Sequence, residues 1–75
     1  MNKDKFLTFL ITHRFWSFFN HFYKYDVDRI NLVVWVGDKQ VVIILNNVAS
    51  LIETTTHGGL QDFTKAHKTI EELIK

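Results

Sequence analysis

The sequence predicts an α+β fold, in which a small antiparallel sheet of two or three strands is accompanied by an N-terminal and a C-terminal helix. Apolar residues recur at helical spacing near both ends of the chain, and two runs rich in β-branched residues lie between them. The length of 75 residues leaves room for a single compact domain, residues 1–75. The expected element order is α-β-β-β-α, with α-β-β-α as the alternative.

The N-terminal helix is predicted over residues 5–24. At 100° per residue, its apolar side chains fall on one arc of about 200°, whereas an ordinary surface helix has an apolar stripe nearer 100° wide. Phe6 and Leu10 lie outside this arc, so the first turns are apolar nearly all round. We therefore expect a helix that is covered on more than one side, followed by a polar connection over residues 25–29. The residues on the arc are Leu7, Phe9, Ile11, Phe15, Trp16, Phe18, Phe19, Phe22 and Tyr23.

A β-hairpin is predicted in the middle of the chain, with strands near residues 29–36 and 40–46. Both segments are rich in Val and Ile, and the sequence Gly37-Asp38-Lys39 between them is a turn signal. The apolar residues are nearly continuous rather than alternating, which is typical of strands covered on both faces.

Two further elements are expected after the hairpin. Residues 48–56 are predicted to form a third strand, with a short helix over residues 47–53 as the alternative. The sequence His57-Gly58-Gly59 indicates a flexible break. A C-terminal helix follows, because its apolar side chains occupy an arc of about 140°. These are Leu60, Phe63, Ala66, Ile70, Leu73 and Ile74.

Composition excludes several classes of function. The chain has no cysteine, so it has no disulfide framework, thiolate zinc site or thiol nucleophile, and a cytoplasmic location is expected. The N-terminal apolar stretch lacks the pattern of a signal peptide. The uncharged run over residues 30–37 is far shorter than the about 20 residues of a spanning helix, so no transmembrane segment is expected.

No group of residues indicates catalysis, a metal or a cofactor. His13 and His21 would lie about 12 Å apart along the predicted helix, too far to share one ion. Asp26 and Asp28 could contact one hard cation, but further oxygen ligands at suitable spacings are missing. The glycine pair at residues 58–59 belongs to no phosphate-binding motif. We therefore predict a protein that is not an enzyme.

Nucleic-acid binding is the alternative function. The order α-β-β-β-α resembles that of double-stranded-RNA-binding domains, whose last helix begins with a lysine cluster. Here that helix begins Gly59-Leu60-Gln61-Asp62, and the net charge of +1 argues against affinity driven by phosphate contacts. The cations that would serve this function are Lys24, Arg29, Lys39, Lys65 and Lys68.

The apolar surplus leads to the main functional hypothesis, a protein-binding or regulatory module that forms a homodimer. Trp16, Phe19, Tyr23 and Trp35 are the expected anchors, because aromatic residues dominate interface energetics. Small proteins without motifs are often phage or mobile-element inhibitors of a host or defence protein. Two other arrangements would also use the surplus: one helix on each face of the sheet, which would close the monomer, or attachment of the first helix to a membrane surface.

Overall fold

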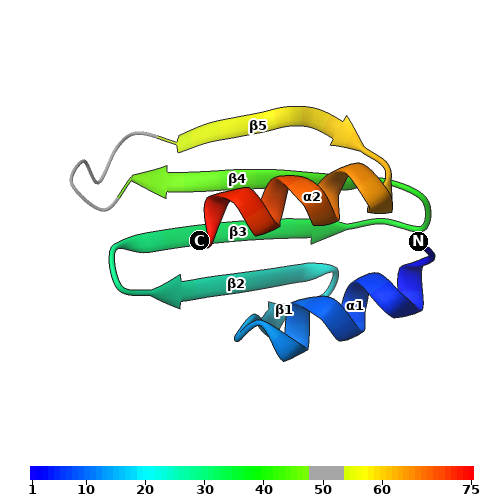
Figure 1. Ribbon diagram of the computed structural model, residues 1–75, viewed down its shortest axis with the longest axis horizontal. Helices are drawn as coiled ribbons and strands as arrows, with labels where there is room; N and C mark the ends of the chain where they lie inside the picture. Colours follow the sequence, from blue (N-terminus) through cyan, green and yellow to red (C-terminus); the bar gives the residue numbers. More distant parts are fainter. Residues whose placement is uncertain (48–53) are drawn as a thin grey trace.

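The computed structural model describes residues 1–47 and 54–75 and has two helices and one five-stranded antiparallel sheet (Figure 1). The predicted α+β class is confirmed, but a sheet of two or three strands understates what is observed. The elements are α1 (Lys3–Thr12), β1 (Trp16–Phe19), β2 (Phe22–Val27), β3 (Ile30–Val36), β4 (Val41–Asn47), β5 (Thr54–Gln61) and α2 (Phe63–Leu73).

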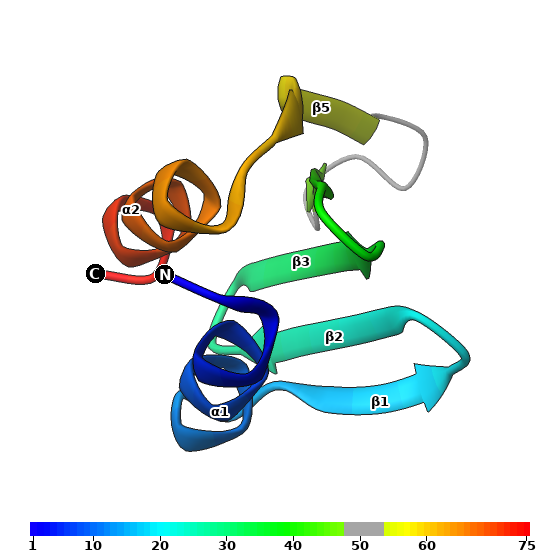
Figure 2. The same cartoon turned by 90° about the vertical axis from the view of Figure 1, so that its right-hand side faces the viewer.

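The sheet is a meander, because each strand pairs with the next one along the chain in the order β1-β2-β3-β4-β5. Both helices lie on the same face of this sheet and contact each other (Figure 2). The arrangement with one helix on each face is therefore wrong. No element of the described residues covers the opposite face.

The single N-terminal helix predicted over residues 5–24 is wrong beyond Thr12. Arg14 adopts a left-handed conformation, with φ of 69°, and the chain then forms β1 and β2 around a turn in which His21 has φ of 65°. Tyr25, expected in a polar connection, is a buried residue of β2. Aromatic residues favour strands. They are so dense in this segment that they also satisfy a helical period, so periodicity did not discriminate between the two structures.

The face that α1 buries also differs from the predicted one. Asn2 caps the helix by accepting a hydrogen bond from the Lys5 N–H at 2.9 Å. Phe6 and Leu10, which the long helix placed outside its apolar arc, are completely buried, whereas Ile11 is 65% exposed. A helix of ten residues packs through one narrow stripe, and this stripe begins at Phe6.

The central hairpin is confirmed to within one residue at each end. The side chains of β3 and β4 that face the helices are almost fully buried, and alternate residues point to the other face. Gly37 lies at the start of the connecting turn, where a Cβ atom would come within 2.6 Å of the Trp35 ring. Glycine thus allows the indole of Trp35 to lie against the turn. The buried residues are Leu32, Val34, Val36, Val41 and Ile43.

Residues 48–53 lie outside the described residues, and with them most of the predicted third strand and of its helical alternative. β5 extends through the predicted break, because Gly58 and Gly59 are part of the strand. Both have positive φ, and the pairing of β4 with β5 is irregular between Val42 and Ile44. The expected breaker is therefore a bulge in a strand.

The C-terminal helix is confirmed as α2, which begins after Asp62. The Asp62 carboxylate caps it by accepting a hydrogen bond from the Lys65 N–H at 2.7 Å. Phe63 contacts Phe6 of α1, with ring centroids 5.5 Å apart. α2 therefore completes a core that is enclosed between the two helices and one face of the sheet.

Candidate functional site

The surface with the strongest functional signal is the face of the sheet that no described helix or strand covers, which we call the open face. Directly paired residues of antiparallel strands point to the same face, so the pairing of the five strands identifies its members. They are Trp16, Phe18, Phe19, Phe22, Lys24, Asp26, Asn31, Val33, Trp35, Val42, Ile44, Thr56 and Leu60.

One row of apolar side chains crosses the whole open face, with one residue from each strand. Phe19 pairs with Phe22, Phe22 with Trp35, Trp35 with Val42, and Val42 with Leu60. We call these five residues the apolar row. No polar side chain interrupts it from one edge of the sheet to the other.

Large apolar groups on the open face are accessible to solvent. The exposed fraction is 66% for Phe19, 60% for Leu60, 52% for Trp16 and 44% for Phe18. An exposed apolar residue is ordinary when it stands alone, but a contiguous group is typical of an interaction surface.

The aromatic residues of the open face form a cluster on β1 and β2. The Phe22 ring lies 6.0 Å from that of Phe18 and 6.4 Å from that of Phe19, between ring centroids, and Trp16 meets Phe18 edge to face at 5.9 Å. The pairing of β1 with β2 shifts between Ser17 and Phe19. This bulge brings two consecutive phenylalanines into contact with the same ring.

Polarity increases along the strands with distance from the apolar row. The next row across the sheet contains Lys24 between Trp16 and Val33, and the row beyond it contains Asp26 paired with Asn31. The face therefore has an apolar end and a polar end, and its one lysine and one aspartate carry opposite charges.

Three of the four predicted anchors lie together on the open face. Trp16, Phe19 and Trp35 point to this side of the sheet. Tyr23 does not, because it pairs with Ser17 and Val34 on the opposite face and packs against the core.

Several residues of the open face were missed as site residues from the sequence. Phe18 and Phe22 were assigned to a helix, and Leu60 was counted in the apolar arc of the last helix. Val42 could have been found, because its alternation with Val41 and Ile43 in β4 already places it on the second face.

The cations predicted for nucleic-acid binding are dispersed. Lys24 lies on the open face, whereas Arg29 and Lys39 lie in the turns at the two opposite ends of β3. Lys65 and Lys68 belong to α2, on the other side of the sheet. These five residues form no common basic patch.

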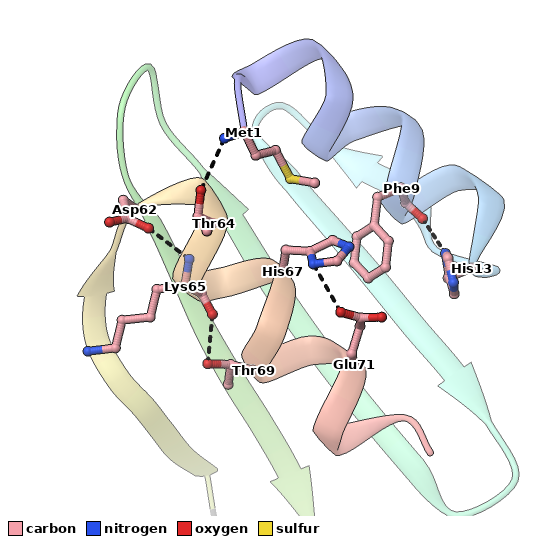
Figure 3. A network of polar contacts seen from close by, with 9 residues as sticks. All are labelled: Met1, Phe9, His13, Asp62, Thr64, Lys65, His67, Thr69 and Glu71. Carbon is pink, nitrogen blue, oxygen red and sulfur yellow. Dashed lines mark hydrogen bonds and ion pairs between the residues drawn. The ribbon is translucent and has the colours of Figure 1, made fainter.

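The helix side of the molecule carries a cluster of polar and aromatic contacts, in which the Phe9–His67 ring contact joins α1 to α2 (Figure 3). The Phe9 ring lies between two imidazoles, 4.3 Å from His13 and 4.2 Å from His67, between ring centroids. His13 Nδ1 lies 2.8 Å from the Phe9 carbonyl, and His67 Nδ1 lies 3.0 Å from the Glu71 carboxylate. The two histidine side chains are held by contacts within their own helices, and the Phe9–His67 ring contact joins α1 to α2. We therefore interpret the cluster as structural.

Asp26 and Asp28, the residues considered for metal binding, do not lie together with further metal ligands in the described part of the chain. Asp26 is on the open face, Asp28 is in the following turn with φ of 56°, and the described residues contain no group of three or more His, Asp or Glu side chains placed to hold an ion. Within the same residues, neither helix is long and apolar enough to cross a membrane.

No protein-family model, curated protein or solved structure matches this chain.

Proposed function

We propose that the chain is a non-enzymatic protein-binding module that binds another protein chain through its open face. The observation that carries the proposal is the apolar row, which is continuous over all five strands and lies on the side of the sheet that faces away from both helices. Covering such a face removes apolar surface from water, which is the dominant favourable term in protein association.

The composition of the open face suits a protein partner. Two tryptophans and three phenylalanines supply large, rigid contacts, and Trp is among the residues enriched at energetic hot spots of interfaces. Exposed aromatic groups of this size can each bury about 100 Å² when they are half accessible in the free protein. The polar end, with Lys24, Asp26 and Asn31, would form the rim of the contact.

A regulatory or inhibitory role is the mode of action that we propose for this module. In this role, the effect on a partner would come from occupying its surface. Nucleic-acid binding remains the alternative. The dispersed cations give it less support than the continuous apolar row gives to a protein partner.

A photocrosslinking experiment in the cells that naturally express the protein tests the proposal. A photoreactive phenylalanine analogue is introduced either at Phe19 or at Ile11. The two positions are matched in exposure, at 66% and 65%, but Phe19 lies on the open face and Ile11 on α1. We expect a protein adduct from position 19 and none from position 11.

The adduct pattern decides the outcome. Adducts of equal yield from both positions would reflect chance collisions, and the absence of an adduct from position 19 would show that this face is free in the cell. Either result would overturn the proposed function.

A further inference from the structure

We infer that the occupant of the open face is a second copy of this chain, bound face to face about a two-fold axis that runs parallel to β3 and passes over Trp35. This inference rests on the proposed function and names its partner. The product would be a sandwich of two five-stranded sheets, with the helices of each copy on the outside.

The apolar row is complementary to itself under this symmetry. In a two-fold interface, if one residue contacts a second residue of the other copy, the second residue of the first copy makes the same contact in return. An axis along the central strand places Phe19 of one copy opposite Leu60 of the other, Phe22 opposite Val42, and Trp35 opposite Trp35. On both sides of the axis, phenylalanines of one copy therefore face smaller aliphatic side chains of the other, and the two Trp35 side chains meet at the axis.

The charges of the face permit two copies to approach. Lys24 and Asp26 lie two residues apart on the same side of β2, so the charges on the open face sum to zero. The whole chain carries a formal net charge of only +1. A strongly charged chain would repel its own copy, whereas this chain pays almost no such penalty.

The size of the face is adequate for a stable dimer. Strands lie about 4.8 Å apart and rise about 3.3 Å per residue, so five strands of about six residues offer a projected area of about 500 Å². Protruding rings make the accessible area larger than this projection. Two such faces bury about 1,000 Å² or more in total, which reaches the lower limit for a specific interface.

The edges of the sheet are less suited to a second copy than the face is. β1 is only four residues long and its pairing is interrupted by a bulge, and β5 contains the bulge at Gly58 and Gly59. Short and bulged edge strands prevent edge-to-edge pairing. The apolar row has no such protection. This difference favours face-to-face packing over pairing at the edges.

Directed crosslinking of the purified protein tests this arrangement, because the chain has no native cysteine. Phe19→Cys and Leu60→Cys are prepared as two separate proteins. The proposed axis brings position 19 of one copy over position 60 of the other, whereas two copies of position 19 are separated by about 19 Å, the width of four strand spacings. A short bismaleimide should therefore crosslink the mixture and neither protein alone.

Circular dichroism checks that both variants fold, and we expect folded proteins because both positions are largely exposed. Absence of a crosslinked dimer in the mixture, or a dimer formed equally by one variant alone, would overturn the inference. An adduct with a different protein from position 19 in cells, combined with no crosslink in the purified mixture, would retain the proposed function and reject the second copy. Absence of both would reject the two proposals together.

Discussion

At the scale of single residues, the neighbours Leu10 and Ile11 show how the chain divides its apolar groups. Leu10 is completely buried between α1 and the sheet, and Ile11 is 65% exposed on the outer side of the same helix. A continuous helix through residue 24 would have placed Ile11 on its apolar arc and Leu10 opposite. The loss of stability when each residue is replaced therefore distinguishes the observed fold from the predicted helix.

We expect Leu10→Ala to lower the free energy of unfolding by about 2–5 kcal/mol, because it removes buried methyl groups and leaves a cavity. Ile11→Ala should change it by about 0.5 kcal/mol or less, as at other surface positions. Urea unfolding followed by circular dichroism measures both, at one fixed protein concentration. Equal losses, or a larger loss for Ile11→Ala, would contradict the observed orientation of α1.

The glycine pair in β5 provides a second test at this scale. Both glycines have positive φ, 79° for Gly58 and 63° for Gly59, so alanine at either position costs about 1–2 kcal/mol of backbone strain. A Cβ atom at Gly58 would also collide with the Gln61 amide, whereas at Gly59 it meets open space. Gln61 is buried, donates to the His57 carbonyl and accepts from the Thr69 hydroxyl.

We therefore expect Gly58→Ala to destabilise the protein by about 1–3 kcal/mol more than Gly59→Ala, since displacing the buried amide breaks its hydrogen bonds. Thermal unfolding of the two variants side by side makes the comparison. A larger loss of stability for Gly59→Ala would contradict a collision between the Gly58 position and the Gln61 amide.

At the scale of elements, the segments that could be predicted from the sequence are those with one dominant local signal. β3 and β4 have β-branched runs around a glycine turn, and α2 has a capping Asp62 before a regular apolar stripe. Residues 13–27 carry conflicting signals, because dense aromatic residues fit a helix and a strand equally well. There the structure is decided by tertiary packing, such as the contact of Phe15 with Tyr25, whose ring centroids are 5.0 Å apart.

The candidate site was only partly predictable for the same reason. Trp16, Phe19 and Trp35 were identified by residue type, without knowledge of the surface they share. Their common place on the open face follows from the packing of both helices on the other face of the sheet, as Figure 2 shows. No local pattern specifies that arrangement, because the apolar residues of β3 and β4 are suited to cover on either side.

The difference in stability between two variants of Arg14 distinguishes a helix that ends at Thr12 from the predicted helix over residues 5–24. Arg14 has φ of 69°, where glycine is unstrained and a residue with a Cβ atom is not. We expect Arg14→Gly to be more stable than Arg14→Ala by about 1 kcal/mol, and both variants lose the same guanidinium. In a continuous helix the order would be reversed, with alanine favoured by about 1 kcal/mol. Chemical denaturation of the two variants determines the order.

At the scale of the whole molecule, the fold has two layers, the pair of helices and the sheet. Among the described residues, no element covers the face of the sheet that points away from the helices. Both helices are used to enclose a single core, and the other side of the sheet retains the apolar row and its aromatic cluster. An antiparallel sheet with one solvated face normally carries polar side chains there. This sheet departs from that pattern mainly at the apolar row, which is why we propose that the open face binds a protein.

The solution mass by light scattering across a dilution series tests the central claim most directly. Leu60→Lys and Ile11→Lys are the matched variants, since each replaces a large aliphatic residue that is at least 60% exposed. We predict a dimer for the wild-type protein and for Ile11→Lys, and about a tenfold to hundredfold weaker dimer for Leu60→Lys, which places a charge opposite Phe19 of the second copy. A wild-type monomer at every concentration, or a Leu60→Lys dimer as strong as the wild-type one, would contradict the account.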